Sequence, residues 1–230
     1  MIKTAYLIIH GFGGGPEETA FLETYLKTKE LDTYSVLIYG HGGSKKDLKS
    51  SNCADWIASV ESFISSLRQK YARIVLLGFS MGGLLSIYVA NTPQIDKIVL
   101  VNTPIFFWNM KIILKDIAIT IKNPRSEKLN YYMESITKTS LKSGIDFLHL
   151  LHKTKKKIEK VKKPTLIIQC KGDESVHYKS GRYIKNKMGD DATLRYYDGG
   201  CHQVFIKSPE VRETVCDCIY DFIRSEHSIT

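Results

Sequence analysis

A glycine-rich turn between an apolar run and a helical pattern constrains the fold of this chain more than any other feature. The apolar run, residues 74–77, is typical of a strand buried in a parallel sheet. The helical pattern that follows ends at Asn91, just before Pro93. Between them lies GFSMG, residues 78–82, a G-x-S-x-G sequence centred on Ser80. Such a tight strand-to-helix turn needs glycine neighbours, and it predicts a serine side chain that stands clear of the sheet.

A serine hydroxyl is a weak nucleophile, so a catalytic Ser80 needs a base, an acid that orients the base, and donors that hold an oxyanion. His202 lies in a glycine-rich loop after the predicted strand 193–197, and Asp173 follows the predicted strand 164–169. The carboxyl ends of parallel strands meet at one edge of a sheet, which is where open α/β sheets bind ligands. The sequence therefore predicts that Ser80 is the nucleophile, His202 the base and Asp173 the orienting acid.

Other side chains compete for these roles. Glu174 is an alternative to Asp173, although adjacent residues point different ways and only one of the two can orient the histidine. His41 is an alternative base, but a loop histidine without a catalytic role is the simpler interpretation. Cys201 could pair with His202 as a cysteine nucleophile, but neighbours in sequence rarely point at each other.

The loop after the first predicted strand, residues 5–9, has the sequence HGFGGGP. It partly matches the dinucleotide fingerprint G-x-G-x-x-G, but Pro16 stands at the third glycine and no acid ends a second strand at the required distance. The favoured interpretation is an H-G-x-G loop whose backbone N–H points toward Ser80, as one half of an oxyanion hole. A helix is expected next, over residues 16–29.

Strands alternate with helices along most of the chain. Further strands are expected over residues 35–39 and 97–102, and further helices over residues 54–71, 178–188 and 211–224. This alternation predicts an α/β fold with a parallel sheet and right-handed crossovers.

The alternation breaks at Thr103, where a long helical insertion begins. The 58 residues 103–160 contain polar joints and helical patterns over 105–121, 129–139 and 141–153. An insertion of this size between core strands predicts a cap over the sheet, so the expected core is residues 1–102 and 161–230 and the expected cap is residues 103–160. Phe106, Phe107 and Trp108 are predicted to line an acyl pocket there; their alternative role is to join cap to core.

The net charge of +9 is confined to one segment. Residues 103–163 contain 14 Lys or Arg and 5 Asp or Glu, whereas basic and acidic residues balance in the rest of the chain. This distribution argues against a nucleic-acid-binding protein with a uniformly basic surface. The lysines at 153 and 155–157 fall on several sides of one predicted helix, so a solvated face is favoured over one that binds a membrane or an anionic substrate.

The five cysteines form no C-x-x-C pair, and their number is odd. Neither a disulfide framework nor a zinc site is indicated, and a reducing, cytoplasmic setting is expected. The apolar run 5–9 has no small-residue cleavage site after it and is interpreted as a strand, not a signal peptide. No apolar run is long enough to span a bilayer.

Taken together, the motifs of this chain resemble those of the α/β-hydrolase family along nearly its full length. They are HGFG at residues 10–13, GHGGS at 40–44, GFSMGG at 78–83, GDESV at 172–176 and GGCH at 199–202. Within the family the chain is similar to small bacterial carboxylesterases and monoacylglycerol-lipase-like enzymes. The resemblance implies an α/β-hydrolase fold with about six mostly parallel strands, helices on both faces and a small helical cap. The chain departs from the family at His177, where a proline usually follows the Asp-x-x-Val turn.

The resemblance also implies a site and an activity. The site is the same triad, Ser80, Asp173 and His202, with the backbone N–H groups of Phe12 and Met81 as the oxyanion hole. The implied activity is hydrolysis of a short- to medium-chain acyl ester or a monoglyceride through an acyl-enzyme on Ser80, with no metal or organic cofactor. The alternatives are a thioesterase or amidase with the same triad and a signalling protein that binds a ligand without turnover. A dehalogenase is disfavoured because a serine stands where that reaction needs an aspartate.

Overall fold

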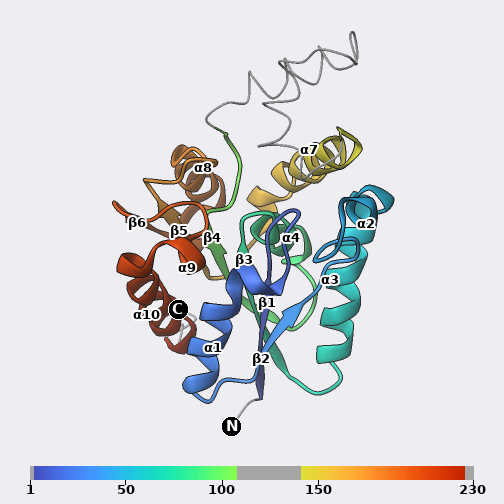
Figure 1. Cartoon of the computed structure of the whole chain (residues 1–230). Coiled ribbons are helices and arrows are strands. Elements are labelled where there is room, and N and C mark those ends of the chain that lie inside the picture. The colour runs from blue at the N-terminus through green and yellow to red at the C-terminus, as the bar shows by residue number, and fades with distance from the viewer. Residues whose placement is uncertain (1–2, 108–140, 226–230) are drawn as a thin grey trace.

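The computed structural model of the chain describes residues 3–107 and 141–225 (Figure 1). Its strands are β1 (Thr4–Ile9), β2 (Thr33–Val36), β3 (Arg73–Phe79), β4 (Ile95–Val101), β5 (Thr165–Cys170) and β6 (Ala192–Tyr197). They form a six-stranded sheet in the order β2-β1-β3-β4-β5-β6, and every neighbouring pair is parallel. The predicted parallel α/β fold is therefore confirmed, and β3, which leads to Ser80, lies in the middle of the sheet.

Helices cover both faces of this sheet. They are α1 (Ala20–Thr28), α2 (Lys45–Ser50), α3 (Cys53–Leu67), α4 (Met81–Val89), α7 (Leu141–Lys155), α8 (Lys179–Met188), α9 (Val204–Lys207) and α10 (Pro209–Arg224). Short 3₁₀ turns span Pro16–Thr19, Ile158–Lys160 and Gly189–Asp191. Among the helices of the described residues, none combines the length and the apolar character needed to cross a membrane.

The buried core follows the alternation of side chains along each strand. In β1, Ala5, Leu7 and Ile9 belong to one buried cluster, whereas Tyr6 and Ile8 belong to another. The first cluster is closed by α3, α4, α7 and α8, and the second by α1, α9 and α10 (Figure 1). The sheet is thus buried on both sides, as its nearly continuous apolar strands require.

The second strand ends earlier than the sequence predicts, because its backbone turns to side-chain partners. β2 covers Thr33–Val36 instead of residues 35–39. Beyond it, the N–H of Ile38 donates to Nε2 of His10 at 3.2 Å, and the N–H of Tyr39 donates to the Ser59 hydroxyl at 3.0 Å. These acceptors replace the strand ladder and direct the chain into the loop of residues 40–44.

The chain after β4 does not enter a helix at once, contrary to the prediction of a helix over residues 105–121. Phe107 instead forms an antiparallel bridge with Val176, and the backbone N–H of Phe106 donates to the Ser180 hydroxyl at 2.9 Å. These contacts hold the start of the predicted cap against the segment that follows β5. The remainder of that predicted helix, and the predicted helix over 129–139, lie outside the described residues.

α7 corresponds to the last helix predicted in the cap, over residues 141–153. Leu150 and Leu151 are buried in the same cluster as α3 and α4. The Thr154 hydroxyl donates to the carbonyl oxygen of Leu84 in α4 at 3.3 Å. The end of the predicted cap segment is therefore anchored on the helix that begins directly after Ser80.

Candidate active site

Ser80 occupies the sharp turn between β3 and α4, and its backbone conformation is one that residues other than glycine rarely adopt. Its φ and ψ are 51° and −118°. Its N–H donates to the carbonyl oxygen of Val101 at 2.8 Å, which ties the turn to β4. Its carbonyl oxygen accepts from the N–H of Gly83 at 2.9 Å, which starts the helix. The strand and the helix together hold the serine in this strained conformation.

The structure brings together the three residues predicted as a triad. Nε2 of His202 lies 3.0 Å from the Ser80 hydroxyl, and Nδ1 of His202 lies 2.8 Å from Oδ2 of Asp173. A carboxylate at that distance accepts the Nδ1 proton, so Nε2 keeps a lone pair that faces the serine hydroxyl. The arrangement can therefore accept a proton from Ser80 and stabilise the resulting imidazolium.

Asp173 is itself fixed by the turn that follows β5. Its side chain is buried, and Oδ1 accepts hydrogen bonds from the backbone N–H groups of Ser175 and Val176 at 2.8 and 2.7 Å. The second oxygen is left to face His202. The turn keeps this geometry with His177 at the position where the family usually has proline.

The competing residues make other contacts. Glu174 accepts a hydrogen bond from the backbone N–H of His202 at 3.0 Å, so it holds the loop and not the imidazole ring. The sulfur of Cys201 accepts from the Ser208 hydroxyl at 3.4 Å. Within the described part of the chain, neither side chain is hydrogen-bonded to Ser80.

His41, the alternative base, is buried among aromatic rings. Its ring centre lies 5.4 to 5.9 Å from those of His10, Phe12 and Trp56. Burial, reinforced by the charge of His10, lowers the pKa of His41 to about 4. Among the described residues, the side-chain hydrogen bond of His41 joins Nδ1 to the Tyr39 carbonyl oxygen at 3.3 Å, whereas the imidazole on the Ser80 hydroxyl is that of His202.

The loop that contains Phe12 is fixed on both sides of Gly11. Nδ1 of His10 donates to the Gly11 carbonyl oxygen at 2.8 Å, and the Gly11 N–H donates to Oε2 of Glu18 at 2.9 Å. Among the described residues, no acceptor contacts the backbone N–H of Phe12 or of Met81, the first residue of α4. Both N–H groups therefore remain available to an oxyanion, and the positive end of the α4 dipole favours one.

Glu18 is a residue of this site that the sequence reasoning missed. Burial raises its pKa, and the Gly11 N–H, the charge of His202 and the Gln203 side chain oppose that rise. Glu18 thus contacts the loop before the serine and lies close to the loop that contains the histidine. In the sequence it is only an acid in the first turn of a helix, and nothing local distinguishes it from Glu17.

The three aromatic residues predicted to line a pocket differ in their surroundings. The Phe107 ring lies 5.9 Å from that of Phe147 in α7, which in turn lies 5.1 Å from the ring of Phe12. Phe106 packs instead on Tyr183, with ring centres 5.3 Å apart, and is 39 % exposed. Trp108 lies outside the described residues.

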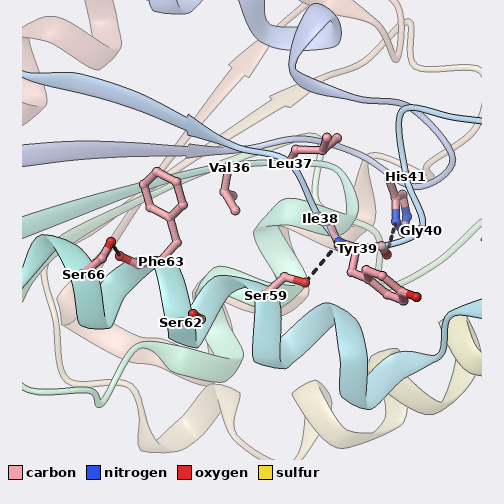
Figure 2. A pocket seen from close by; sticks show the side chains of 10 residues that line it. All are labelled: Val36, Leu37, Ile38, Tyr39, Gly40, His41, Ser59, Ser62, Phe63 and Ser66. Atoms are coloured by element: carbon pink, nitrogen blue, oxygen red, sulfur yellow. Dashed lines mark hydrogen bonds between the residues drawn. The ribbon is translucent and has the colours of Figure 1, made fainter.

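A separate cavity of about 460 Å³ lies between α3 and the segment that follows β2 (Figure 2). Its lining includes Leu37, Tyr39, Ser59 and Phe63. The Ser59 hydroxyl already accepts from Tyr39 and donates to a helix carbonyl. None of the three predicted triad residues lines this cavity. Within the described residues, no group of three His, Cys, Asp or Glu side chains is placed to hold a metal ion.

Comparisons with known proteins agree with this fold. The prolyl oligopeptidase family matches residues 40–228. A carboxylesterase of Bacillus subtilis is 22% identical over 227 residues, which cover 95% of this chain and 92% of the relative. A thermostable monoacylglycerol lipase of Bacillus sp. (strain H-257) is 31% identical over 185 residues, which cover 74% of this chain and 70% of the relative. A solved structure from work on the metagenome-derived lipolytic enzymes LipS and LipT has a TM-score of 0.82 at 20% identity, covering 98% of this chain and 95% of that one.

The fold and these relatives define an α/β-hydrolase, and the predictions of that fold and of a carboxylic ester hydrolase are confirmed. The chain belongs to the prolyl oligopeptidase family, which the match over residues 40–228 shows.

Proposed function

We propose that this protein hydrolyses carboxylic esters with Ser80 as nucleophile, His202 as general base and Asp173 as the acid that orients the histidine. One observation carries the proposal: a single imidazole contacts the serine hydroxyl at 3.0 Å and a buried carboxylate at 2.8 Å. Both distances lie within the reach that proton transfer and orientation need.

The reaction follows from these contacts. Oγ of Ser80 attacks the ester carbonyl carbon while its proton moves to Nε2 of His202, and the carbonyl oxygen becomes an oxyanion. The backbone N–H groups of Phe12 and Met81 stabilise that oxyanion, each by about 3 kcal/mol of barrier. The oxyanion collapses, the alcohol leaves with the histidine proton, and Ser80 is left acylated. Water then gives a proton to His202 and attacks the acyl carbon. The second tetrahedral intermediate collapses, the bond from the acyl carbon to Oγ of Ser80 breaks, His202 returns its proton to Oγ, and the carboxylic acid leaves.

The proposed substrate is an ester with an apolar acyl group of short to medium length, or a monoglyceride. Phe107 and Phe147 support this proposal, because their rings extend from that of Phe12, next to the proposed oxyanion hole. Apolar and aromatic side chains are the usual lining of such pockets. The names of two relatives, a carboxylesterase and a monoacylglycerol lipase, point to the same class of substrate.

Two features of the organisation also remain proposals. The first is that residues 103–160 form a cap that covers this site, anchored by the Phe107–Val176 bridge and by α7. The second is a cytoplasmic location, which rests on the odd number of cysteines. Neither a nucleic-acid partner nor membrane contact through the cap lysines is part of the proposal.

A panel of p-nitrophenyl esters with acyl chains of increasing length tests the function, with Ser80→Ala as the control. We expect turnover by the wild type, none above background by Ser80→Ala, and covalent labelling of Ser80 by a fluorophosphonate probe. Matched thioester and amide substrates decide between the esterase and the alternatives, and the amide is pertinent because the family is named for peptidases. A folded wild type that is labelled once but never turns over would instead support the ligand-binding alternative.

A further inference from the structure

The side chain of Asn102 lies at the meeting point of two core strands and the loop that contains His202. It follows β4 directly, is fully buried, and has a φ of 48°, in the left-handed region. Asparagine tolerates this region better than most residues with a side chain. From the sequence, Asn102 is predicted only to end the strand over residues 97–102.

The amide of Asn102 is hydrogen-bonded on both sides. Nδ2 donates to the carbonyl oxygens of Cys201 and His202, at 3.3 and 3.0 Å. Oδ1 accepts from the backbone N–H of Cys170 at 2.9 Å and from the Gln169 amide at 3.4 Å. An amide has two donor hydrogens and one acceptor oxygen with two lone pairs, so all of its capacity is used.

Through these contacts one side chain is hydrogen-bonded both to the segment that precedes Asp173 and to the loop that contains His202. Cys170 is the last residue of β5, three positions before Asp173, and the two accepting carbonyls belong to the loop of His202 itself. Among the described residues, the other backbone hydrogen bonds of Cys201 and His202 lie on their N–H side, where Glu174 accepts from His202 and Ser208 accepts from Cys201. The carbonyl side of the loop is therefore held by Asn102.

We propose that Asn102 is a positioning residue for the hydrolytic reaction: it sets the distance of the His202 imidazole from Ser80 by fixing the backbone that holds the histidine. The inference rests on the proposed triad. Because a displacement of about 1 Å in a catalytic group can cost about 100-fold in rate, a side chain that fixes this backbone acts on turnover through the histidine.

Two substitutions test the proposal. Asn102→Asp keeps the size of the side chain and the acceptor toward Cys170, but it turns an oxygen toward the two loop carbonyls. Asn102→Gly keeps the positive φ and removes the amide altogether. Asn91→Asp is the matched control, since its amide also donates to a backbone carbonyl, that of Lys160 at 3.3 Å, at a distant surface position.

We expect kcat for a p-nitrophenyl ester to fall by about 10- to 100-fold in both Asn102 variants, with KM within about twofold of the wild type. Asn91→Asp should leave both constants unchanged. Circular dichroism and thermal melting identify the variants that are folded at the assay temperature, and the glycine variant serves if the aspartate variant does not fold.

A double-mutant cycle separates positioning from a general effect on folding. In a His202→Ala background, where no imidazole remains to be positioned, the Asn102 substitution should lower the residual rate by less than about twofold. Equal losses in both backgrounds, or unchanged kcat in a folded Asn102 variant, would overturn the proposal. A rate in Ser80→Ala or His202→Ala that equals that of the wild type would refute the triad instead, so the two failures are distinguishable.

Discussion

Gly82 lies so close to Ile9 that a β-carbon on the glycine would overlap the Ile9 carbonyl oxygen and lie 2.8 Å from that of His10. The helix after Ser80 is thereby packed directly on the backbone that leads into the loop of Phe12. Gly82→Ala should displace that backbone and lower kcat/KM by about 100-fold or more, because the proposed oxyanion donors would move relative to Ser80.

Gly144→Ala is the control for this substitution, because a β-carbon there meets no atom within 4 Å. Gly144 lies within α7, so the control should be neutral or raise stability by up to about 1 kcal/mol. Steady-state kinetics and thermal melting of both variants measure the contrast. A Gly82→Ala enzyme with wild-type kcat/KM would contradict the close packing of helix and loop.

Glu18 provides a second test, because charge and hydrogen bonding can be separated there. Glu18→Gln keeps an acceptor for the Gly11 N–H but removes the negative charge that interacts with His202. We expect kcat to fall by about threefold to tenfold as the imidazolium of the transition state loses a stabilising charge. Glu18→Ala should in addition lower the free energy of unfolding by about 1 kcal/mol, since the Gly11 N–H is left without its acceptor.

The exposed neighbour Glu17 is the control for Glu18. Glu17→Gln changes the net charge equally, one residue away, and should leave kcat within about twofold of the wild type. Steady-state kinetics at two ionic strengths measure the contrast. Equal effects of the two substitutions would mean that only the overall charge of this region matters.

His10 and His41 should make the protein less stable in mild acid. Burial lowers the pKa of each to about 4, from 6.5. Between these pH values the unfolded chain binds more protons than the folded one, so stability rises with pH across the window and is lost as the pH falls through it. Each histidine contributes up to about 1.4 kcal/mol per pH unit to that slope.

His41→Phe should reduce this acid sensitivity, because phenylalanine binds no proton on unfolding. The substitution leaves no partner of Nε2 unsatisfied, since the Nε2 atom of His41 has no hydrogen-bond partner among the described residues. A phenyl ring fits beside Phe12 and Trp56, so stability at pH 7 should change by less than about 1 kcal/mol. Urea unfolding at several pH values between 4 and 7 measures the slope, with His149→Phe at an exposed position as the control. An unchanged slope in His41→Phe would show that His41 takes up no proton on unfolding.

Phe147 should influence which acyl chains are accepted. Phe147→Ala removes the ring between Phe12 and Phe107, so kcat/KM for medium-chain esters should fall by about tenfold relative to acetate esters, as expected for 1–2 kcal/mol of lost apolar contact. Phe106→Ala is the control, because that ring packs on Tyr183. The measurement is the ratio of kcat/KM between medium-chain and acetate esters. Equal ratios in both variants would show that Phe147 does not line the proposed acyl pocket.

The proximity of the three proposed triad residues could be predicted because each has a local signal and the parallel topology brings the signals together. Ser80, Asp173 and His202 all lie after the carboxyl ends of parallel strands, so they meet at one edge of the sheet. The roles of Glu18 and Asn102 could not be predicted in this way. Each depends on a contact between segments distant in the sequence, and the local pattern around each resembles an ordinary helix start or strand end.

Two errors in the predicted elements have physical causes. Residues 105–107 belong to an apolar stretch that resembles a helix, but Phe107 pairs with Val176 instead. α2 was not predicted, although Ser44 and Asp47 form a capping box at its start. That signal follows a glycine-rich loop and introduces a helix of only six residues, too short for a clear apolar period.

The strained backbone of Ser80 predicts that the stability of the protein depends on which residue replaces the serine. Glycine adopts a φ of 51° without a β-carbon to strain, so Ser80→Gly should be more stable than Ser80→Ala by about 1 kcal/mol, measured by thermal melting of the two inactive variants. Equal melting temperatures would show that the turn is relaxed.

The same geometry sets a hazard for laboratory evolution of this protein. A library screened only for thermal stability would select the replacement of Ser80, the proposed nucleophile, by glycine, and the selected variants would be stable, folded and inactive. Any such screen has to score catalysis in the same round.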